Sequence, residues 1–143
     1  MKSINEQRKA KERETKKKRG TFNSSKQEED AYHILHFMYP HLLRQYSSKK
    51  YPFNCDFYDP ASDTYIECNF SWTHGWHWFD ENDPNDIARL ELMKSKHSRY
   101  YDNAIETWTI RDVKKRRCAI ENNLKYIVFW KEDEVRKYVL DEL

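Results

Sequence analysis

The fold is decided by residues 51–71, which read Tyr51-Pro-Phe-Asn-Cys-Asp-Phe-Tyr58, then Asp59-Pro-Ala-Ser-Asp63, then Thr64-Tyr-Ile-Glu-Cys-Asn-Phe-Ser71. The first and third runs have the composition of β-strands, and the middle run has the proline, serine and aspartates of a turn. The pattern therefore predicts a β-hairpin. Because side chains alternate along a strand, its second strand should present Tyr65, Glu67 and Asn69 on one face and Ile66, Cys68 and Phe70 on the other.

Two carboxylates of this hairpin, Asp56 and Glu67, are expected to converge. A register that pairs them leaves a compact turn between the strands. Like charges that face each other on a sheet repel, so natural strands avoid the arrangement unless a cation lies between them. Mg²⁺ takes oxygen ligands and engages phosphates, and Mn²⁺ is its usual substitute. The hairpin thus predicts a Mg²⁺ site, with a solvent-facing, salt-bridged hairpin as the alternative.

Four helices are predicted from apolar residues at helical spacing and from capping residues. Ser24 or Ser25 is the expected cap of the first helix, Asp86 that of the second and Asp112 that of the third. The expected helices are residues 26–43 with a break at Pro40, a helix from Asp86, a helix from Asp112 to about Asn122, and a charged helix over residues 131–143.

Two further strands are predicted, a short one over residues 104–109 and a buried one over residues 125–130. Residues 72–85 lack periodicity and should form an ordered loop. The resulting order predicts an α/β, or α+β, domain with a mixed central β-sheet flanked by helices.

The hairpin resembles the core of the PD-(D/E)XK nuclease superfamily, in which an Asp on one strand and a Glu-x-Lys on the next hold a metal. Cys55-Asp-Phe-Tyr58 and Tyr65-Ile-Glu-Cys-Asn69 are the matching runs, with Asn69 in the place of the Lys. A closer resemblance is to the very-short-patch-repair-like branch, which includes phage homing endonucleases. It is carried by the later runs Ser71-Trp-Thr-His-Gly75, Arg111-Asp-Val-Lys-Lys115 and Leu124-Lys-Tyr-Ile-Val-Phe-Trp130.

This resemblance implies a single-domain restriction-endonuclease-like fold over residues 21–130 and a metal-dependent endonuclease that hydrolyses DNA, on one strand or both. Asp56 and Glu67, with the backbone carbonyl of Cys68, would hold Mg²⁺. Glu28 matches the helix-borne Glu of the branch and His74 its histidine. An imidazole titrates near neutrality, which suits acid–base catalysis, whereas the Asn69 amide orients a water but exchanges no proton.

Other interpretations of these residues are structural. Glu28 would only interact favourably with the dipole of its helix, and His74 would only form hydrogen bonds with the backbone of its loop. Cys68, His74 and His77 would form part of a zinc site, although the paired spacing of zinc modules is missing.

Charge is divided unevenly along the chain. Residues 1–20 carry nine Lys or Arg and three Glu, which leaves 17 basic and 21 acidic residues in the rest of a chain whose net charge is +2. A basic arm binds phosphates by releasing counterions, or else remains a solvated tail. The expected DNA contacts are Lys16, Lys17, Lys18, Arg19, Trp72, Arg111, Lys114, Lys115 and Arg116. For Trp72, as for Trp76 and Trp78, core packing is the alternative to stacking on bases.

Length and composition limit the class of protein. A chain of 143 residues suits one domain, with residues 1–20 as an arm and 131–143 as a charged tail or helix. No apolar run reaches the roughly 18–20 residues that cross a bilayer, and three cysteines without a disulfide framework indicate a reducing compartment. We expect a cytoplasmic protein of a bacterium or phage-infected host, without a membrane partner, as a monomer or homodimer.

Two rival functions remain open at this point. One is a nuclease-derived DNA-binding module that has lost its activity, because Asn69 replaces the Lys. The other is a zinc-stabilised interaction protein.

Overall fold

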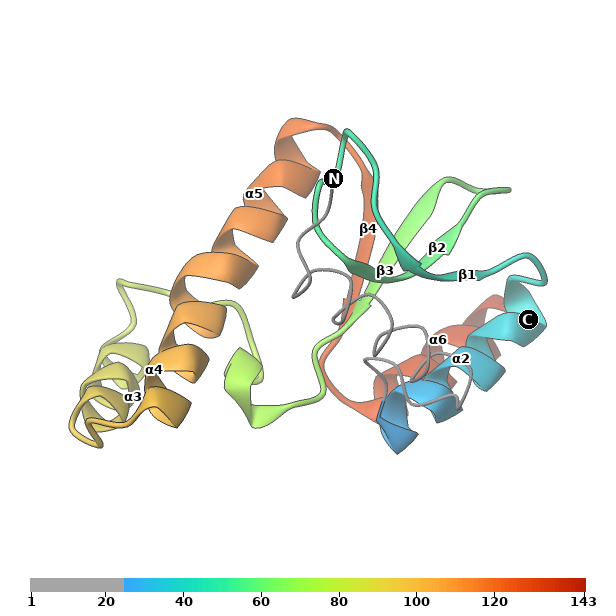
Figure 1. Ribbon diagram of the computed structural model, residues 1–143. Coiled ribbons are helices and arrows are strands. Elements are labelled where there is room, and N and C mark those ends of the chain that lie inside the picture. The colour runs from blue at the N-terminus through green and yellow to red at the C-terminus, as the bar shows by residue number, and fades with distance from the viewer. Residues whose placement is uncertain (1–24) are drawn as a thin grey trace, which may run out of the picture.

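The computed structural model describes residues 25–143, which form a four-stranded mixed sheet between two layers of helices (Figure 1). The strands lie side by side in the order β1 (Leu43–Tyr46), β2 (Cys55–Asp59), β3 (Thr64–Cys68) and β4 (Lys125–Phe129). Strand β2 is antiparallel to both β1 and β3, and β4 is parallel to β3. The predicted mixed α+β architecture is therefore confirmed. Lys16, Lys17, Lys18 and Arg19, predicted to contact DNA, lie outside the described residues.

The hairpin of β2 and β3 is confirmed, together with its register. Phe57 pairs with Ile66, and Tyr58 pairs with Tyr65. The next pair in this register is Asp56 and Glu67, so both carboxylates lie on one face, at the end of the hairpin away from its turn.

Helices surround the sheet, and none in residues 25–143 is long and apolar enough to cross a membrane. They are α2 (Lys26–Met38), a 3₁₀ turn η1 (Trp72–His74), α3 (Pro84–Lys94), α4 (Arg99–Glu106), a π-helical segment η2 (Thr107–Arg111), α5 (Asp112–Glu121) and α6 (Glu132–Glu142). The last three elements before β4 follow without a gap, so residues 99–121 form one continuous helix. Figure 1 shows this helix on one side of the sheet and α2 and α6 side by side on the other.

The strand predicted over residues 104–109 is wrong, because these residues lie within the continuous helix. Their threonine, tryptophan and isoleucine content favours a strand locally, but tertiary packing overrides such propensity. Ala104 and Trp108 are buried with Met93 of α3. The threonine hydroxyls donate to the carbonyls one turn earlier, Thr107 to Asn103 and Thr109 to Ile105, as threonine does inside helices.

Several predicted boundaries also shift. Ser25 caps α2 as expected, but the helix ends at Met38, ahead of Pro40, and the short strand β1 follows, which was not predicted. The next helix begins at Pro84, because Asp83 rather than Asp86 accepts the cap hydrogen bond, from the N–H of Asn85. Asp112 does not cap α5, because its backbone is already helical.

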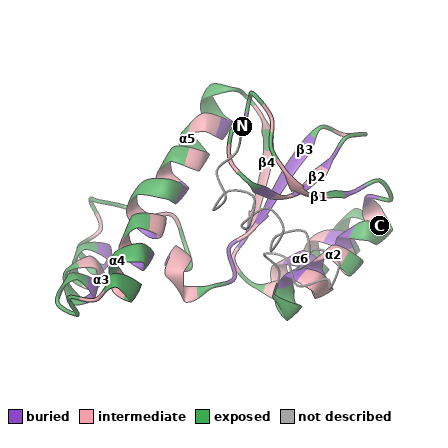
Figure 2. Cartoon of the chain, in the orientation of Figure 1, coloured by how far each residue is buried: buried purple, intermediate pink, exposed green. Residues whose placement is uncertain are grey.

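The core is divided by the sheet (Figure 2). One face packs Phe57, Ile66 and Phe129 against α2 and α6, and Val135 and Val139 of α6 are buried there. The other face, toward α5, carries a tyrosine-rich cluster around Tyr51 and Tyr65. Strand β3 is buried at all but its last position, so its charged residue Glu67 is 2% exposed.

Candidate functional site

The predicted carboxylates line one cavity, of about 490 Å³, where the parallel strands β3 and β4 end. Ligands commonly bind at the carboxyl ends of parallel strands. The cavity is lined by Glu28, Phe53, Asn54, Asp56, Glu67, Cys68, Asn69, His74, Arg111 and Lys115. Every residue predicted for catalysis or metal binding is in this set, although α2, the hairpin and the loop after it contribute them separately.

The two hairpin carboxylates are fixed by the backbone of the opposite strand. Asp56 Oδ2 accepts a hydrogen bond from the N–H of Cys68 at 2.8 Å, and Glu67 Oε1 accepts one from the N–H of Asp56 at 2.9 Å. The strands thus hold both carboxylates in place before any ligand binds, which is the preorganisation that a charged site needs.

Glu28 adds a third carboxylate from the first turn of α2. It is 7% exposed, its carboxyl group interacts with that of Asp56, and its Oε2 is buried without a hydrogen-bond partner. Burial, followed by the nearby negative charges of Glu67 and Glu28, raises the pKa of Asp56 well above its usual value, and burial also raises the pKa of Glu28.

Lys115 reaches the same carboxylates from α5. Its Nζ lies 3.0 Å from Glu67 Oε2, and its side chain is only 17% exposed. Burial alone would lower the pKa of this amine, but Glu67, Asp56 and Asp112 outweigh burial and leave the pKa raised. Lys115 was predicted as a contact for DNA phosphates. Its position at the carboxylates, near the place where Asn69 stands for a Lys, was not predicted.

Two tyrosines complete the surroundings of Glu67. The hydroxyl of Tyr51 donates to Glu67 Oε2 at 2.7 Å and lies 2.9 Å from the hydroxyl of Tyr126. Burial, and then the charge of Glu67, raises the pKa of both phenols far above the usual value, so both stay protonated. Glu67 is therefore held by donors on both oxygens, which accounts for a carboxylate at 2% exposure.

His74 is held by Asp112, which was predicted only as a helix cap. Its Nδ1 lies 2.7 Å from Oδ2 of Asp112, whose side chain is 3% exposed. With Nδ1 engaged, Nε2 is the nitrogen left for a water or a phosphate. The signal in the sequence was the acidic residue next to Arg111 in a strongly basic run, but a capping role was predicted instead.

The loop that carries His74 is fixed by Trp108. Gly75 has φ +74°, and a Cβ there would collide with the Trp108 indole. The indole N–H donates to the carbonyl of His77 at 3.0 Å, and Arg89 stacks on the ring while donating to the carbonyl of Gly75 at 2.7 Å. His77 contacts Asp86 at 2.7 Å and so belongs to the framework of the loop. Trp108 lies in the π-helical segment η2, which ends directly before Asp112. Such segments are frequent at functional sites.

Other predicted contacts for DNA lie apart from the cavity. The indole of Trp72 donates to the hydroxyl of Tyr100 and packs against Tyr101. Lys114 is exposed on α5, and Arg116 stacks on Trp78 in a different cavity.

Mg²⁺ fits this site on two observations. The buried Oε2 of Glu28 has no hydrogen-bond partner, and burial with neighbouring negative charge raises the pKa of both Glu28 and Asp56, which a bound cation would offset. Within residues 25–143, no group of three or more His, Cys, Asp or Glu side chains is placed to hold a metal ion by itself. Mg²⁺ does not require one, because it binds through one or two carboxylates, keeps several waters and takes further ligands from phosphates.

Comparison of the chain with protein-family models, curated proteins and solved structures finds no match.

Proposed function

We propose that the protein is a Mg²⁺-dependent endonuclease that hydrolyses phosphodiester bonds in DNA. The observation that carries the proposal is the convergence of Asp56, Glu67 and Glu28 with the amine of Lys115 and the His74–Asp112 pair around one cavity. Carboxylates, an amine and an oriented imidazole are the groups that phosphodiester hydrolysis uses.

The proposal extends to a restriction-endonuclease-like fold. An antiparallel hairpin carries both metal carboxylates, and a helical crossover then leads to a parallel strand, β4. This order supports the resemblance to PD-(D/E)XK nucleases, in which the same hairpin holds the metal.

Asp56, Glu67 and the carbonyl of Cys68 would hold Mg²⁺, with Glu28 bonded to one of its waters. When bound, the ion neutralises charge on the phosphate and lowers the pKa of a water. The side chains do the remaining work of orientation, since both hairpin carboxylates are already fixed by backbone N–H groups.

Lys115 supplies the positive charge that Asn69 lacks. Its ammonium group donates to Glu67 and lines the cavity, so it can also donate to a phosphate oxygen or to the attacking water. Asn69 is buried at the cavity, where its amide would orient a water.

His74 would transfer a proton at Nε2, either from the attacking water or to the leaving oxygen. Asp112 keeps the proton of the neutral imidazole on Nδ1 and so presents Nε2 as the acceptor. Arg111 lines the cavity as well and would bind a flanking phosphate.

The proposal is tested by incubating supercoiled plasmid with the purified protein and Mg²⁺ or Mn²⁺. We expect nicked or linear product only with the metal, and a loss of at least about 100-fold for Asp56→Ala and Glu67→Ala. Glu91→Ala, at an exposed carboxylate of α3, is the matched control and should retain the rate.

Other outcomes would support the rivals. Intact plasmid together with tight, salt-sensitive binding would contradict the endonuclease and favour the inactive DNA-binding module. One equivalent of zinc without DNA affinity would favour the zinc protein, although His74 and His77 contact different aspartates.

A further inference from the structure

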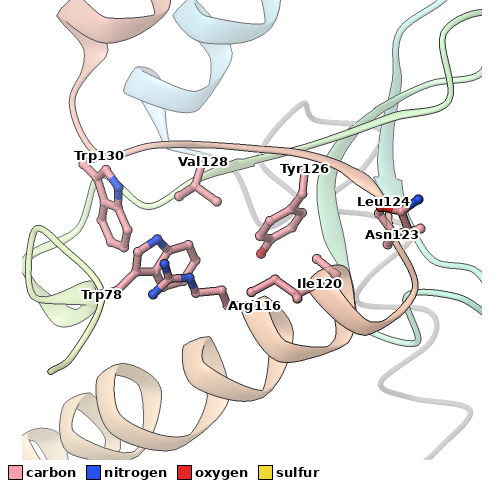
Figure 3. A pocket seen from close by; sticks show the side chains of 9 residues that line it. Trp78, Arg116, Ile120, Asn123, Leu124, Tyr126, Val128 and Trp130 are labelled. Carbon is pink, nitrogen blue, oxygen red and sulfur yellow. The ribbon is translucent and has the colours of Figure 1, made fainter. Parts of the chain in front are cut away.

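A second cavity, of about 480 Å³, opens between α5, the edge strand β4 and the loop after η1 (Figure 3). Its lining is aromatic, with Trp78 from the loop, Tyr126 from β4 and Trp130 directly after that strand. Arg116 and Asn123 add polar groups. The size lies in the range of cavities that hold small ligands, about 300–1,000 Å³.

Trp78, Tyr126 and Trp130 are too far apart or too steeply inclined to cover one another's ring faces. Trp78 meets Trp130 edge to face with 5.0 Å between ring centroids, so these two rings form a corner. Trp78 and Tyr126 are within 23° of parallel, but their centroids lie 6.5 Å apart. At that separation the two rings do not overlap in face contact, which would place their atoms about 3.5–4 Å apart. A flat ring can therefore stack at this corner.

The charge of the cavity selects among flat ligands. The Arg116 guanidinium lies 5.0 Å from the centre of the Trp78 ring, so the cation position over that ring is already filled from within the protein. A cationic ligand would be repelled, whereas a flat ring that carries a phosphate would gain an ion pair. Residues 114–125 contain five basic residues and one acid, and of these Lys114, Arg117 and Lys125 are exposed.

The cavity also lies next to the carboxylate site, although the two share no lining residue. Arg116 follows Lys115 on α5, so consecutive side chains serve the two cavities. Tyr126 lines the second cavity, and its hydroxyl contacts that of Tyr51, which in turn donates to Glu67. A single polynucleotide strand could thus occupy both.

We propose that this cavity binds one unstacked base of the DNA strand whose phosphate lies at the carboxylates, with the base on Trp78 and Trp130 and its phosphate on Arg116. The inference rests on the proposed endonuclease function and adds the form of its substrate, which is a strand with a base out of the helical stack. Aromatic side chains bind bases of single strands in this way, with little sequence preference.

The experiment uses the full chain in EDTA, so that binding is measured without cleavage. A single-stranded DNA oligonucleotide with one 5-iodouracil is bound and irradiated, and the cross-linked peptide is identified by mass spectrometry. We expect cross-links at Trp78 or Trp130. Cross-links only elsewhere, for example at Trp72 or Trp76, would overturn the proposal, as would tighter binding of the equivalent RNA.

Variants provide a second measurement. Trp78→Ala should weaken oligonucleotide binding by about 5- to 140-fold, which corresponds to the loss of one base–aromatic stack, and Trp78→Phe should restore most of the affinity. Trp76→Ala, at an exposed residue of the same loop, is the matched control and should change affinity less than twofold. Arg116→Met leaves the aromatic corner intact. It should reduce the slope of log affinity against log salt concentration by about 1, the contribution of one phosphate contact.

Equal affinity of Trp78→Ala and wild type would overturn the proposal even if the DNA is cleaved. Base cross-links at Trp78 without plasmid cleavage would instead contradict only the endonuclease.

Discussion

At the scale of single residues, the cavity sets three buried carboxylates against one another. Burial raises the pKa of both Asp56 and Glu28, and the negative charges of Glu67 and Glu28 raise that of Asp56 further. Glu67 accepts hydrogen bonds from Lys115 and Tyr51. Such an arrangement lowers the stability of the fold in the absence of a cation. Destabilising clusters of this kind are typical of functional sites, where activity is gained at the expense of stability.

Replacement of Asp56 by asparagine measures how much the repulsion between the carboxylates lowers stability. Asp56→Asn keeps an oxygen for the N–H of Cys68 but removes a charge, so in EDTA at pH 7 it should raise the free energy of unfolding by about 1 kcal/mol and Tm by roughly 4 °C. The raised pKa means that the native wild type holds a proton that the unfolded chain releases above about pH 3.8. The advantage of the variant should therefore grow as pH rises toward 7. Thermal melts across this pH range measure it, and a variant less stable than wild type at pH 7 would show that no repulsion is stored.

The His74–Asp112 pair makes a separate prediction. Asp112→Asn can present an amide N–H to Nδ1 and so favour the wrong tautomer of the imidazole. We expect plasmid cleavage to slow by about 100-fold or more and its pH profile to shift, while the Tm changes little. An unchanged pH profile would mean that Asp112 has only a structural role.

At the scale of elements, the hairpin was predictable because its signals are local. Alternation along Tyr65, Ile66 and Glu67, with a turn rich in aspartate and proline, fixes both faces and the register. Lys115 and Asp112 were not assigned to the site because it is the approach of α5 to the sheet that brings them there. The periodicity of the sequence does not indicate how α5 packs against the sheet.

Helix α6, predicted as a charged terminal helix or tail, is part of the core. Val135 is fully buried and Val139 is 5% exposed, and both pack with α2. Val135→Ala should lower the free energy of unfolding by roughly 1–3 kcal/mol in urea denaturation, because it leaves a cavity in this layer. Leu140→Ala on the same helix, at a side chain that is 71% exposed, is the control and should change stability by less than about 0.5 kcal/mol. Equal effects of the two would contradict the docking of α6.

At the scale of the whole molecule, charge is separated between a basic arm and a domain with an acidic cavity. Residues 25–143 bring Arg111 to the carboxylates and Arg116 to the aromatic cavity, while residues 1–20 carry nine further basic residues. The arm lies outside the described residues, and its contribution to DNA binding can be measured by deleting it.

Deletion of residues 1–20 should weaken DNA binding at low salt and flatten the slope of affinity against salt concentration, since fewer counterions are released. Cleavage at saturating protein should persist, because the carboxylates, Lys115 and His74 that line the cavity all belong to residues 25–143. Fluorescence anisotropy at several salt concentrations measures the slope. The same slope for both proteins would show that the arm makes no contact with phosphates.

The central claim is that the hairpin carboxylates bind a divalent metal. The most direct test is a crystal soaked in Mn²⁺, with anomalous scattering recorded at a wavelength where manganese contributes. We predict one strong peak within about 2.2 Å of oxygens of Asp56 and Glu67. That peak should be absent from crystals of Asp56→Ala. Clear electron density for the side chains of the cavity, with no anomalous peak among them at saturating Mn²⁺, would contradict the claim.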